Sequence, residues 1–247
     1  MGDLDFQEVV FNGTPLFLPS STLNTMTHCT HSAEGDDRKH LYVETAHSDI
    51  MAGWLNEGNA TFLDIGAATG AMTVPFALRF PDAKIYAFEP YHKVRQILIE
   101  TLIKNKCVHP LVFDCALSAN SGVDTFTAYE PDETGECPYL PEASSLSELK
   151  SDRAKNFFHV RVETLDHITK NISITDNCIV KIDVEGWEVK ILEAGQCFIS
   201  QFRPRFSIDI HTNPFGPGDT SDDVKSLLQN HSYSFEEIGH VMMCRPA

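Results

Sequence analysis

Short apolar runs rich in β-branched and aromatic residues alternate with stretches of helical periodicity from about residue 60 onward. The runs predict strands at residues 61–65, 85–88, 111–114, 178–183 and 206–211. Between them, apolar side chains recur with helical spacing over residues 94–102, and residues 188–194 predict a further helix that Gly195 would end. This alternation indicates an α/β protein whose parallel sheet is covered by helices on both faces.

Three segments depart from this rhythm. Residues 1–38 combine a strand-like piece at 15–19 with irregular polar sequence, and we treat them as an N-terminal extension of a single domain at 39–247. Residues 129–156 are rich in Pro, Glu, Ser and Asp, and they predict an inserted loop that is either a lid over a substrate or an ordinary surface excursion. Residues 233–245 predict an antiparallel hairpin at the end of the chain.

Composition narrows the class of protein. The chain has 247 residues, enough for a sizeable core, and its 35 acidic against 19 basic residues give a net charge of −16. Such a charge repels phosphate backbones, so we expect no nucleic-acid partner. The chain contains no apolar run of about 18 residues and no signal-peptide pattern, and we expect no membrane span. Seven scattered cysteines without a CxxC motif favour a cytoplasmic protein, whereas the oligomeric state stays undetermined.

The most distinctive local motif is FLDIGAATGAMT, residues 62–73, in which an apolar strand ends at Asp64 and turns through glycines into a helix. Gly66 and Gly70 provide the tight turn and close backbone approach that a ligand site requires. A dinucleotide fingerprint places a glycine where Ala68 stands, and Asp64 opposes a pyrophosphate. The acid instead suits a cationic ligand such as S-adenosylmethionine, which carries an ammonium and a sulfonium group.

Carboxylates follow the next two strands as well. Glu89 ends the second strand, where it could accept hydrogen bonds from both hydroxyls of a ribose, in NAD or in S-adenosylmethionine alike. Asp114 ends the third strand, where it could accept from an adenine amino group, with Ala116 leaving room for the ring. Each could also be a solvated acid at a strand end, but their order and spacing together favour an adenosine site.

The fourth strand carries charges where a parallel strand should be buried: Lys181, Asp183 and Glu185 share one side, and Glu188 follows. Buried charges cost several kcal/mol unless they are paired, so this cluster is either a structural ion pair or part of a ligand site. Open α/β sheets bind ligands at the carboxyl edge, which favours the second interpretation.

The fifth strand ends in the same way. Asp209 and His211 share a face and would lie beside Asp183 if the fourth and fifth strands are neighbours. His211 is a candidate general base because histidine titrates near neutral pH. Asp183, Asp209 and His211 are alternatively candidate ligands of Mg²⁺ or another divalent ion, since they combine carboxylate oxygens with an imidazole.

The motifs LDIGAATG, AFEP, ALSANSG, VETLDHI, KIDVEGWEVKILEAG and SIDIH occur in this order between about residues 60 and 212. In this respect the chain resembles the FkbM family of S-adenosylmethionine-dependent methyltransferases. It departs from the family pattern in LEAG, where L-x-G-A is frequent, and in Asp209, where a Glu is usual. The resemblance implies a Rossmann-like class I methyltransferase fold, with a seven-stranded, mostly parallel sheet, an antiparallel last strand and helices on both faces.

The resemblance also implies an activity: transfer of a methyl group from S-adenosylmethionine to a hydroxyl on a sugar, glycan or small metabolite. Its implied cofactor residues are Asp64, Gly66, Ala67 and Gly70 around the methionine end, Glu89 at the ribose, and Asp114 with Cys115 at the adenine. Asp183, Glu185 and His211 would face the acceptor as catalytic residues.

Two other functions stay open. An NAD-dependent oxidoreductase could use a similar sheet, but Ala68, Asp64 and the lack of a recognisable Tyr-x-x-x-Lys pair count against it. A non-catalytic module could retain the cofactor pocket without turnover. Within the methyltransferase interpretation, metal-assisted and metal-free transfer both stay open.

Overall fold

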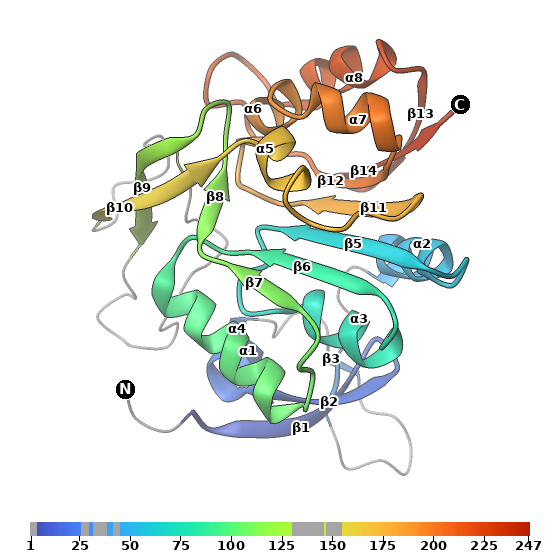
Figure 1. Ribbon diagram of the computed structural model, residues 1–247. Helices are drawn as coiled ribbons and strands as arrows, with labels where there is room; N and C mark the ends of the chain where they lie inside the picture. Colours follow the sequence, from blue (N-terminus) through green and yellow to red (C-terminus); the bar gives the residue numbers. More distant parts are fainter. Residues whose placement is uncertain (1–3, 26–29, 32–38, 42–44, 130–145, 147–154) are drawn as a thin grey trace.

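The computed structural model describes residues 4–25, 30–31, 39–41, 45–129, 146 and 155–247. A seven-stranded sheet in the order β13-β14-β12-β11-β5-β6-β7 forms the centre of the molecule (Figure 1). Its strands are β5 (Ala60–Ile65), β6 (Lys84–Phe88), β7 (Leu111–Phe113), β11 (Asn177–Ile182), β12 (Arg205–Asp209), β13 (Tyr233–Ile238) and β14 (Val241–Pro246). Strands β7, β6, β5, β11 and β12 pair in parallel, whereas β14 runs antiparallel to both of its neighbours, β12 and β13. The predicted Rossmann-like sheet with an antiparallel last strand is confirmed.

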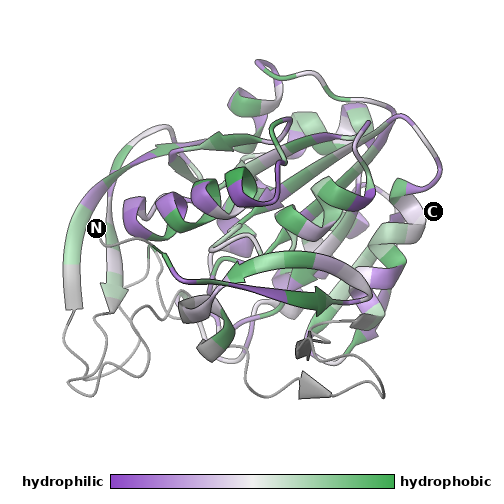
Figure 2. Ribbon diagram, turned by 90° about the horizontal axis from the view of Figure 1, so that it is seen from below, coloured by the Kyte–Doolittle hydropathy of each residue, from purple (hydrophilic) through white to green (hydrophobic). Residues whose placement is uncertain are grey.

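Helices cover both faces of this sheet, as predicted. One face packs against α2 (Thr45–Leu55), α3 (Thr73–Arg79) and α4 (His92–Lys104). The other packs against α5 (Leu165–Thr169), α6 (Glu188–Glu193), α7 (Gln196–Phe202) and α8 (Ser221–Gln229). Strand β5 shows how alternation builds the two cores, because Phe62 joins the first core and Leu63 and Ile65 the second. Figure 2 shows the central strands mostly in hydrophobic colours, whereas the helices show both hydrophobic and hydrophilic colours. Within the described ranges, no helix is long and apolar enough to cross a membrane.

The N-terminal residues add a second, smaller sheet. It contains β1 (Phe6–Phe11), β2 (Thr14–Pro19), β3 (Thr30–His31) and β4 (Lys39–Leu41) in the order β2-β1-β4-β3, and α1 (Ser20–Thr25) follows β2. The sequence predicted the strand at 15–19 but missed β1, whose three consecutive buried residues, Val9 to Phe11, break the period of two. Strand β1 pairs with β4, and β2 packs on α3 and α4. The boundary at residue 38 stays a prediction.

A third sheet in the order β8-β10-β9 stands apart from the central one (Figure 1). It contains β8 (Cys115–Leu117), β9 (Gly122–Tyr129) and β10 (Lys155–Glu163), with β9 and β10 paired antiparallel. The predicted loop at 129–156 joins these two strands. Residues 130–145 and 147–154 lie outside the described residues, so the lid stays a prediction.

The predicted end of the helix at Gly195 is confirmed in position. Helix α6 ends at Glu193 with Ala194 as its C-cap, so Gly195 follows the cap, with a φ of −118°. A Cβ at this position would lie 2.7 Å from Leu165 Cδ2, so close packing of α5 favours the glycine. Helix α7, which the sequence did not predict, begins at Gln196.

Candidate functional site

The turn after β5, residues 65–70, lies against the carboxyl ends of both neighbouring strands. Gly66 has a φ of +82°, and a Cβ there would lie 1.9 Å from the carbonyl oxygen of Asp183, which follows β11. The N–H groups of Gly66 and Ala67 donate to the carbonyl of Phe88 at 3.1 and 3.0 Å, on the side of β6. Only glycine can occupy position 66, because both the backbone conformation and the contact exclude a side chain. We call residues 65–70 the glycine turn.

Two further positions of the glycine turn have left-handed backbone. Gly70 has a φ of +95°, and a Cβ there would lie 2.6 Å from Leu98 Cδ1 of α4. Ala68 has a φ of +47°, an uncommon conformation for a residue with a side chain, and its N–H donates to Glu89 Oε2 at 3.0 Å. The turn and Glu89 are therefore coupled directly. Strained backbone that the surrounding structure maintains is characteristic of ligand sites.

Glu89 is buried just beyond the end of β6. Its second oxygen, Oε1, accepts from the N–H of Tyr91 at 2.7 Å, and Arg95 Nη1 donates to its carbonyl oxygen at 2.8 Å. Burial raises the pKa of the Glu89 carboxyl to about 7, although the hydrogen bonds from Tyr91 and Ala68 act in the opposite direction. Near neutral pH this carboxyl therefore exchanges between its ionised and neutral forms.

Asp64 and Lys181 face each other from neighbouring strands. Asp64 is fully buried, and its Oδ2 accepts from the hydroxyl of Thr73 at 2.5 Å. Lys181 Nζ lies 3.8 Å from Asp64 Oδ1 and 3.0 Å from Asp183 Oδ2. The Lys181 ammonium group thus lies between the Asp64 carboxylate of β5 and the Asp183 carboxylate that follows β11. Pairing of this kind offsets the large desolvation cost of buried charges.

His211 lies among three carboxylates. Its Nδ1 is 2.8 Å from Glu188 Oε1, and its Nε2 lies 3.6 Å from Asp183 Oδ1 and 3.7 Å from Glu185 Oε1. Burial acts to lower the pKa of His211, but the Glu188 hydrogen bond and the charges of Glu188, Glu185 and Asp183 outweigh it and raise the pKa to about 9. The predicted catalytic residues Asp183, Glu185 and His211 are therefore brought together, and the resting imidazole is protonated at neutral pH.

Glu188 is the site residue to which the sequence analysis assigned no role. It is fully buried in the first turn of α6, and its Oε1 accepts from the N–H of Gly186 at 3.0 Å as well as contacting His211. The sequence contains a signal for it. Glu188, Ile191 and Leu192 are the buried residues of α6 and recur with helical spacing, so an acid occupies an otherwise apolar stripe.

The candidate metal ligands are also close together. One donor atom each of Asp183, Asp209 and His211 lies within 4.8 Å of the others. However, Lys181 Nζ already lies 3.0 Å from Asp183 Oδ2. A divalent ion would have to bind beside this ammonium group, so the donor set fits a divalent ion poorly.

The two predicted adenine residues lie at the neighbouring strand. The N–H of Glu89 donates to the carbonyl of Phe113 at 3.2 Å, and Asp114 follows directly. The Asp114 side chain is 65% exposed and pairs with Arg161 at 3.0 Å. Burial raises the pKa of the Cys115 thiol to about 11, so it is neutral at physiological pH. The ribose and adenine candidates are therefore neighbours, with Arg161 as a competing partner for Asp114.

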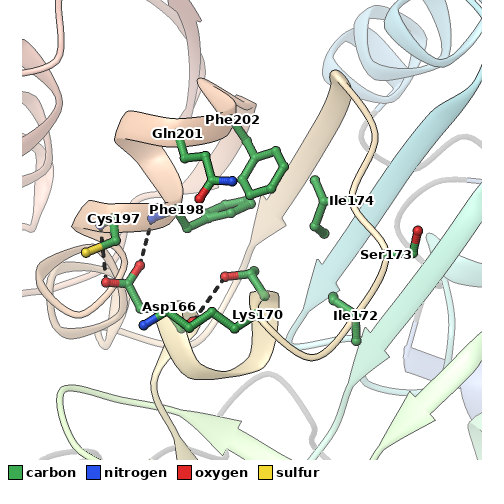
Figure 3. A pocket seen from close by; sticks show the side chains of 10 residues that line it. Asp166, Lys170, Ile172, Ser173, Ile174, Cys197, Phe198, Gln201 and Phe202 are labelled. Atoms are coloured by element: carbon green, nitrogen blue, oxygen red, sulfur yellow. Dashed lines mark hydrogen bonds between the residues drawn. The ribbon is translucent and has the colours of Figure 1, made fainter.

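A separate groove of about 440 Å³ lies between α5, α7 and the loop before β11 (Figure 3). Asp166 points at the start of α7, where its carboxylate accepts from the N–H groups of Cys197 and Phe198 at 3.2 and 2.8 Å. None of the predicted site residues lines this groove. Asp166 therefore caps a helix there.

The model of the methyltransferase FkbM domain matches residues 64–235, more than half of the chain. This chain belongs to the FkbM methyltransferase family. The match extends from Asp64 to Phe235 and therefore contains all of the predicted site residues. This assignment agrees with the resemblance seen in its motifs.

Individual relatives of this FkbM protein are distant. It is 23% identical over 228 residues to AmbE, the AMB antimetabolite synthetase of Pseudomonas aeruginosa, covering 80% of this chain and 11% of AmbE. The FkbM methyltransferase of Methylobacillus flagellatus KT has a TM-score of 0.48 and 14% identity, covering 75% of this chain and 43% of that one. The precorrin-6y C5,15-methyltransferase of Geobacter metallireducens has a TM-score of 0.45 and 11% identity over 87% of this chain and 91% of that one. This chain spans about a ninth of the length of AmbE.

Proposed function

We propose that this FkbM protein is a methyltransferase that uses S-adenosylmethionine to methylate a hydroxyl group on a sugar, glycan or small metabolite. The observation that carries the proposal is the contact between the glycine turn and the acidic end of β11, where a Cβ at Gly66 would lie 1.9 Å from Asp183 O. A methyl donor held at the turn and an acceptor held at the acids would meet across this contact. Bringing the two reactants together in this way is the main task of a methyl-transfer site.

The cofactor half of the site matches S-adenosylmethionine in charge and in donor chemistry. Asp64 would attract the ammonium group, and Gly66, Ala67 and Gly70 would let the methionine end approach the backbone closely. The Glu89 oxygens, which now accept from the N–H groups of Ala68 and Tyr91, are the acceptors that the ribose hydroxyls require. Asp114 and Cys115 would line the adenine.

The acceptor half supplies a positioned base. When bound, S-adenosylmethionine supplies an electrophilic methyl group on a sulfonium. Glu188 orients His211 through Nδ1, which leaves Nε2 directed toward Asp183 and Glu185, where the acceptor hydroxyl would bind. His211 Nε2 would accept the proton of the acceptor hydroxyl as that oxygen takes up the methyl group. Because the resting imidazole must first lose a proton, the rate is expected to rise with pH toward about 9.

We further propose that the transfer needs no divalent metal. Lys181 already provides positive charge beside Asp183, which is the role that Mg²⁺ would otherwise fill. Methyl transfer should therefore proceed unchanged in EDTA. Loss of activity in EDTA, with recovery on adding Mg²⁺, would overturn this proposal and restore Asp183, Asp209 and His211 as metal ligands.

Calorimetric titration with S-adenosylhomocysteine, with NAD in parallel, tests the cofactor. We expect micromolar binding of S-adenosylhomocysteine, none of NAD, and a loss of binding in Glu89→Ala. Glu236→Ala is the matched control, because Glu236 pairs with Arg245 on the surface of β13, outside the site. Absence of binding by the parent protein would favour a non-catalytic module. His211→Ala should abolish transfer and leave this binding unchanged, whereas a lost cofactor affinity would place His211 in the cofactor site.

A further inference from the structure

The loop between β12 and α8 exposes a large apolar side chain next to the acidic cluster. Phe215 is 55% exposed, although the loop that carries it is held by many hydrogen bonds. Its own N–H donates to Asn213 Oδ1 at 2.9 Å, and Asn213 is bonded in turn to the carbonyl of Gly218 and to the side chain of Asp223. Hydrogen bonds hold this loop in a conformation that keeps the phenyl ring in solvent. An exposed apolar side chain on such an ordered loop indicates a binding surface.

A second aromatic side chain forms a corner with Phe215. The Trp187 ring centroid lies 4.9 Å from that of Phe215, with an angle of 59° between the ring planes. Trp187 Nε1 donates to Ser118 Oγ at 3.0 Å, which fixes the indole against the loop after β8. Lys190 Nζ lies 5.1 Å from the Phe215 ring centroid. We call Trp187 and Phe215 the aromatic platform.

The aromatic platform is attached rigidly to the acceptor half of the site. Gly186 separates Glu185 from Trp187, and a Cβ at Gly186 would lie 2.8 Å from the carbonyl oxygen of Thr212 and 3.0 Å from Pro214 Cδ. Thr212 follows His211 directly. The loops after β11 and β12 therefore pack backbone to backbone, and the platform begins within a few residues of Glu185 and of His211.

We propose that the aromatic platform binds the ring of the methyl acceptor, and that the acceptor is a neutral, polyhydroxylated ring of the pyranose type. Such a ring presents an apolar C–H face, which suits the electron-rich face of an aromatic side chain, and hydroxyl groups at its rim. The hydroxyls would donate to Glu185 and Asp183, whose negative charge disfavours an anionic sugar. This inference rests on the proposed function and specifies the acceptor subsite of that same reaction.

Trp187 itself is the reporter for the test. The chain has two tryptophans, so in Trp54→Phe the emission comes from Trp187 alone. This variant, loaded with S-adenosylhomocysteine, is titrated with methyl glucoside, methyl galactoside, methyl mannoside and methyl rhamnoside, and with glucuronate as the anionic comparison. We expect a saturable change in emission with at least one methyl pyranoside and none with glucuronate. Wild-type protein is titrated in parallel. If the variant is unstable, the wild-type titration replaces it, because the buried Trp54 adds only a constant background to the emission.

Phe215→Ala should weaken this pyranoside binding by several-fold, up to about tenfold, the loss expected for one stacking contact, and leave S-adenosylhomocysteine affinity unchanged. Phe157→Ala is the matched control, since Phe157 is 56% exposed on β10 and lies outside the platform. Saturable binding that Phe215→Ala retains, or no emission change with any of the four pyranosides, would overturn the platform. The titration is repeated without S-adenosylhomocysteine. The two titrations together distinguish a failure of the cofactor site from a failure of the platform to bind the pyranoside.

Discussion

The two ends of β5 and β11 differ in chemistry although the strands pair along their whole length. At the amino ends, the hydroxyls of Thr61 and Thr175 lie 2.9 Å apart, and Asn177 Nδ2 donates to the carbonyl of Trp54 at 2.9 Å. At the carboxyl ends, the contacts are between the charged groups of Asp64 and Lys181 and their partners. Neutral hydrogen bonds maintain one end, and costly buried charges are kept at the other.

Positive φ, in contrast, occurs at both edges of the sheet. The turn before β5 uses Gly58 and Asn59 at positive φ, and Gly58 has open space around its missing Cβ. Arg203, which precedes β12, also has positive φ, as do Ala68 and Glu185 at the carboxyl ends. Buried charge therefore distinguishes the carboxyl edge, whereas the groove shown in Figure 3 lies toward the amino edge, before β11. The size of a hollow is a poorer guide to chemistry here than buried charge.

Replacing a glycine by alanine at each end of β5 should give the largest difference in stability and in cofactor binding. Gly66→Ala forces a methyl group against Asp183 O and should lower the free energy of unfolding by more than about 3 kcal/mol and abolish S-adenosylhomocysteine binding. Gly58→Ala meets only the backbone penalty, about 1 kcal/mol. Urea unfolding and calorimetry measure both effects. Equal costs at the two positions would contradict the comparison.

The buried lysine gives the second contrast. Lys181→Met leaves Asp64 buried without its ammonium neighbour and should destabilise the fold by about 3 kcal/mol. Lys84→Met, at the amino end of β6, removes a surface contact with Ser173 and should change stability by no more than about 0.5 kcal/mol. Thermal unfolding compares the two, and a stable Lys181→Met protein would show that Asp64 becomes neutral at little cost.

Glu89→Gln should separate stability from function. The raised pKa of Glu89, about 7 against 4.5 for a free carboxyl, contributes stability below pH 4.5 that is lost as the pH rises through 7. At pH 8 the glutamine variant avoids the cost of a buried ionised carboxyl, but its amide nitrogen loses the hydrogen bond from Ala68 or from Tyr91. Its stability should therefore stay within about 2 kcal/mol of the parent. Its S-adenosylhomocysteine affinity should nevertheless fall by about tenfold, because the amide provides one acceptor in place of two.

The same carboxyl predicts a pH dependence of cofactor binding. Ionised Glu89 accepts ribose hydroxyls better than the neutral acid does, so S-adenosylhomocysteine should bind several-fold more tightly at pH 8 than at pH 6. In Glu89→Gln the affinity should be independent of pH over this interval. Calorimetry at both values measures the difference, and a pH dependence that persists in the variant would assign it to another group.

Removing one hydroxyl at the amino end of β11 should have a small effect on stability and none on cofactor binding. Thr175→Val loses the contact with Thr61 and the hydrogen bond to the carbonyl of Asn177, which should cost about 1 kcal/mol of stability. S-adenosylhomocysteine affinity should stay at the parent value. A changed affinity would show that the two ends of the sheet are coupled.

The sequence was most informative where a feature depends on neighbouring residues. Strand periodicity and the glycines after β5 are local, and a parallel sheet necessarily gathers the ends of its strands at one edge. Asp64, Glu89, Asp183 and His211 could therefore be placed at that edge from the sequence. Strand β1 was missed because burial on both faces removes the alternation that marks a strand.

By itself, then, the sequence determined the fold class, the family and the edge at which the chemistry lies. Only the tertiary structure decided which partners each charge has: Lys181 between Asp64 and Asp183, and Glu188 beneath His211. It also decided that Gly195 serves packing, and it paired Trp187 with Phe215. The reason is physical, because periodicity and turn chemistry act over a few residues, whereas the pairing of charges and rings depends on rotamers and loops that meet only when the chain has folded.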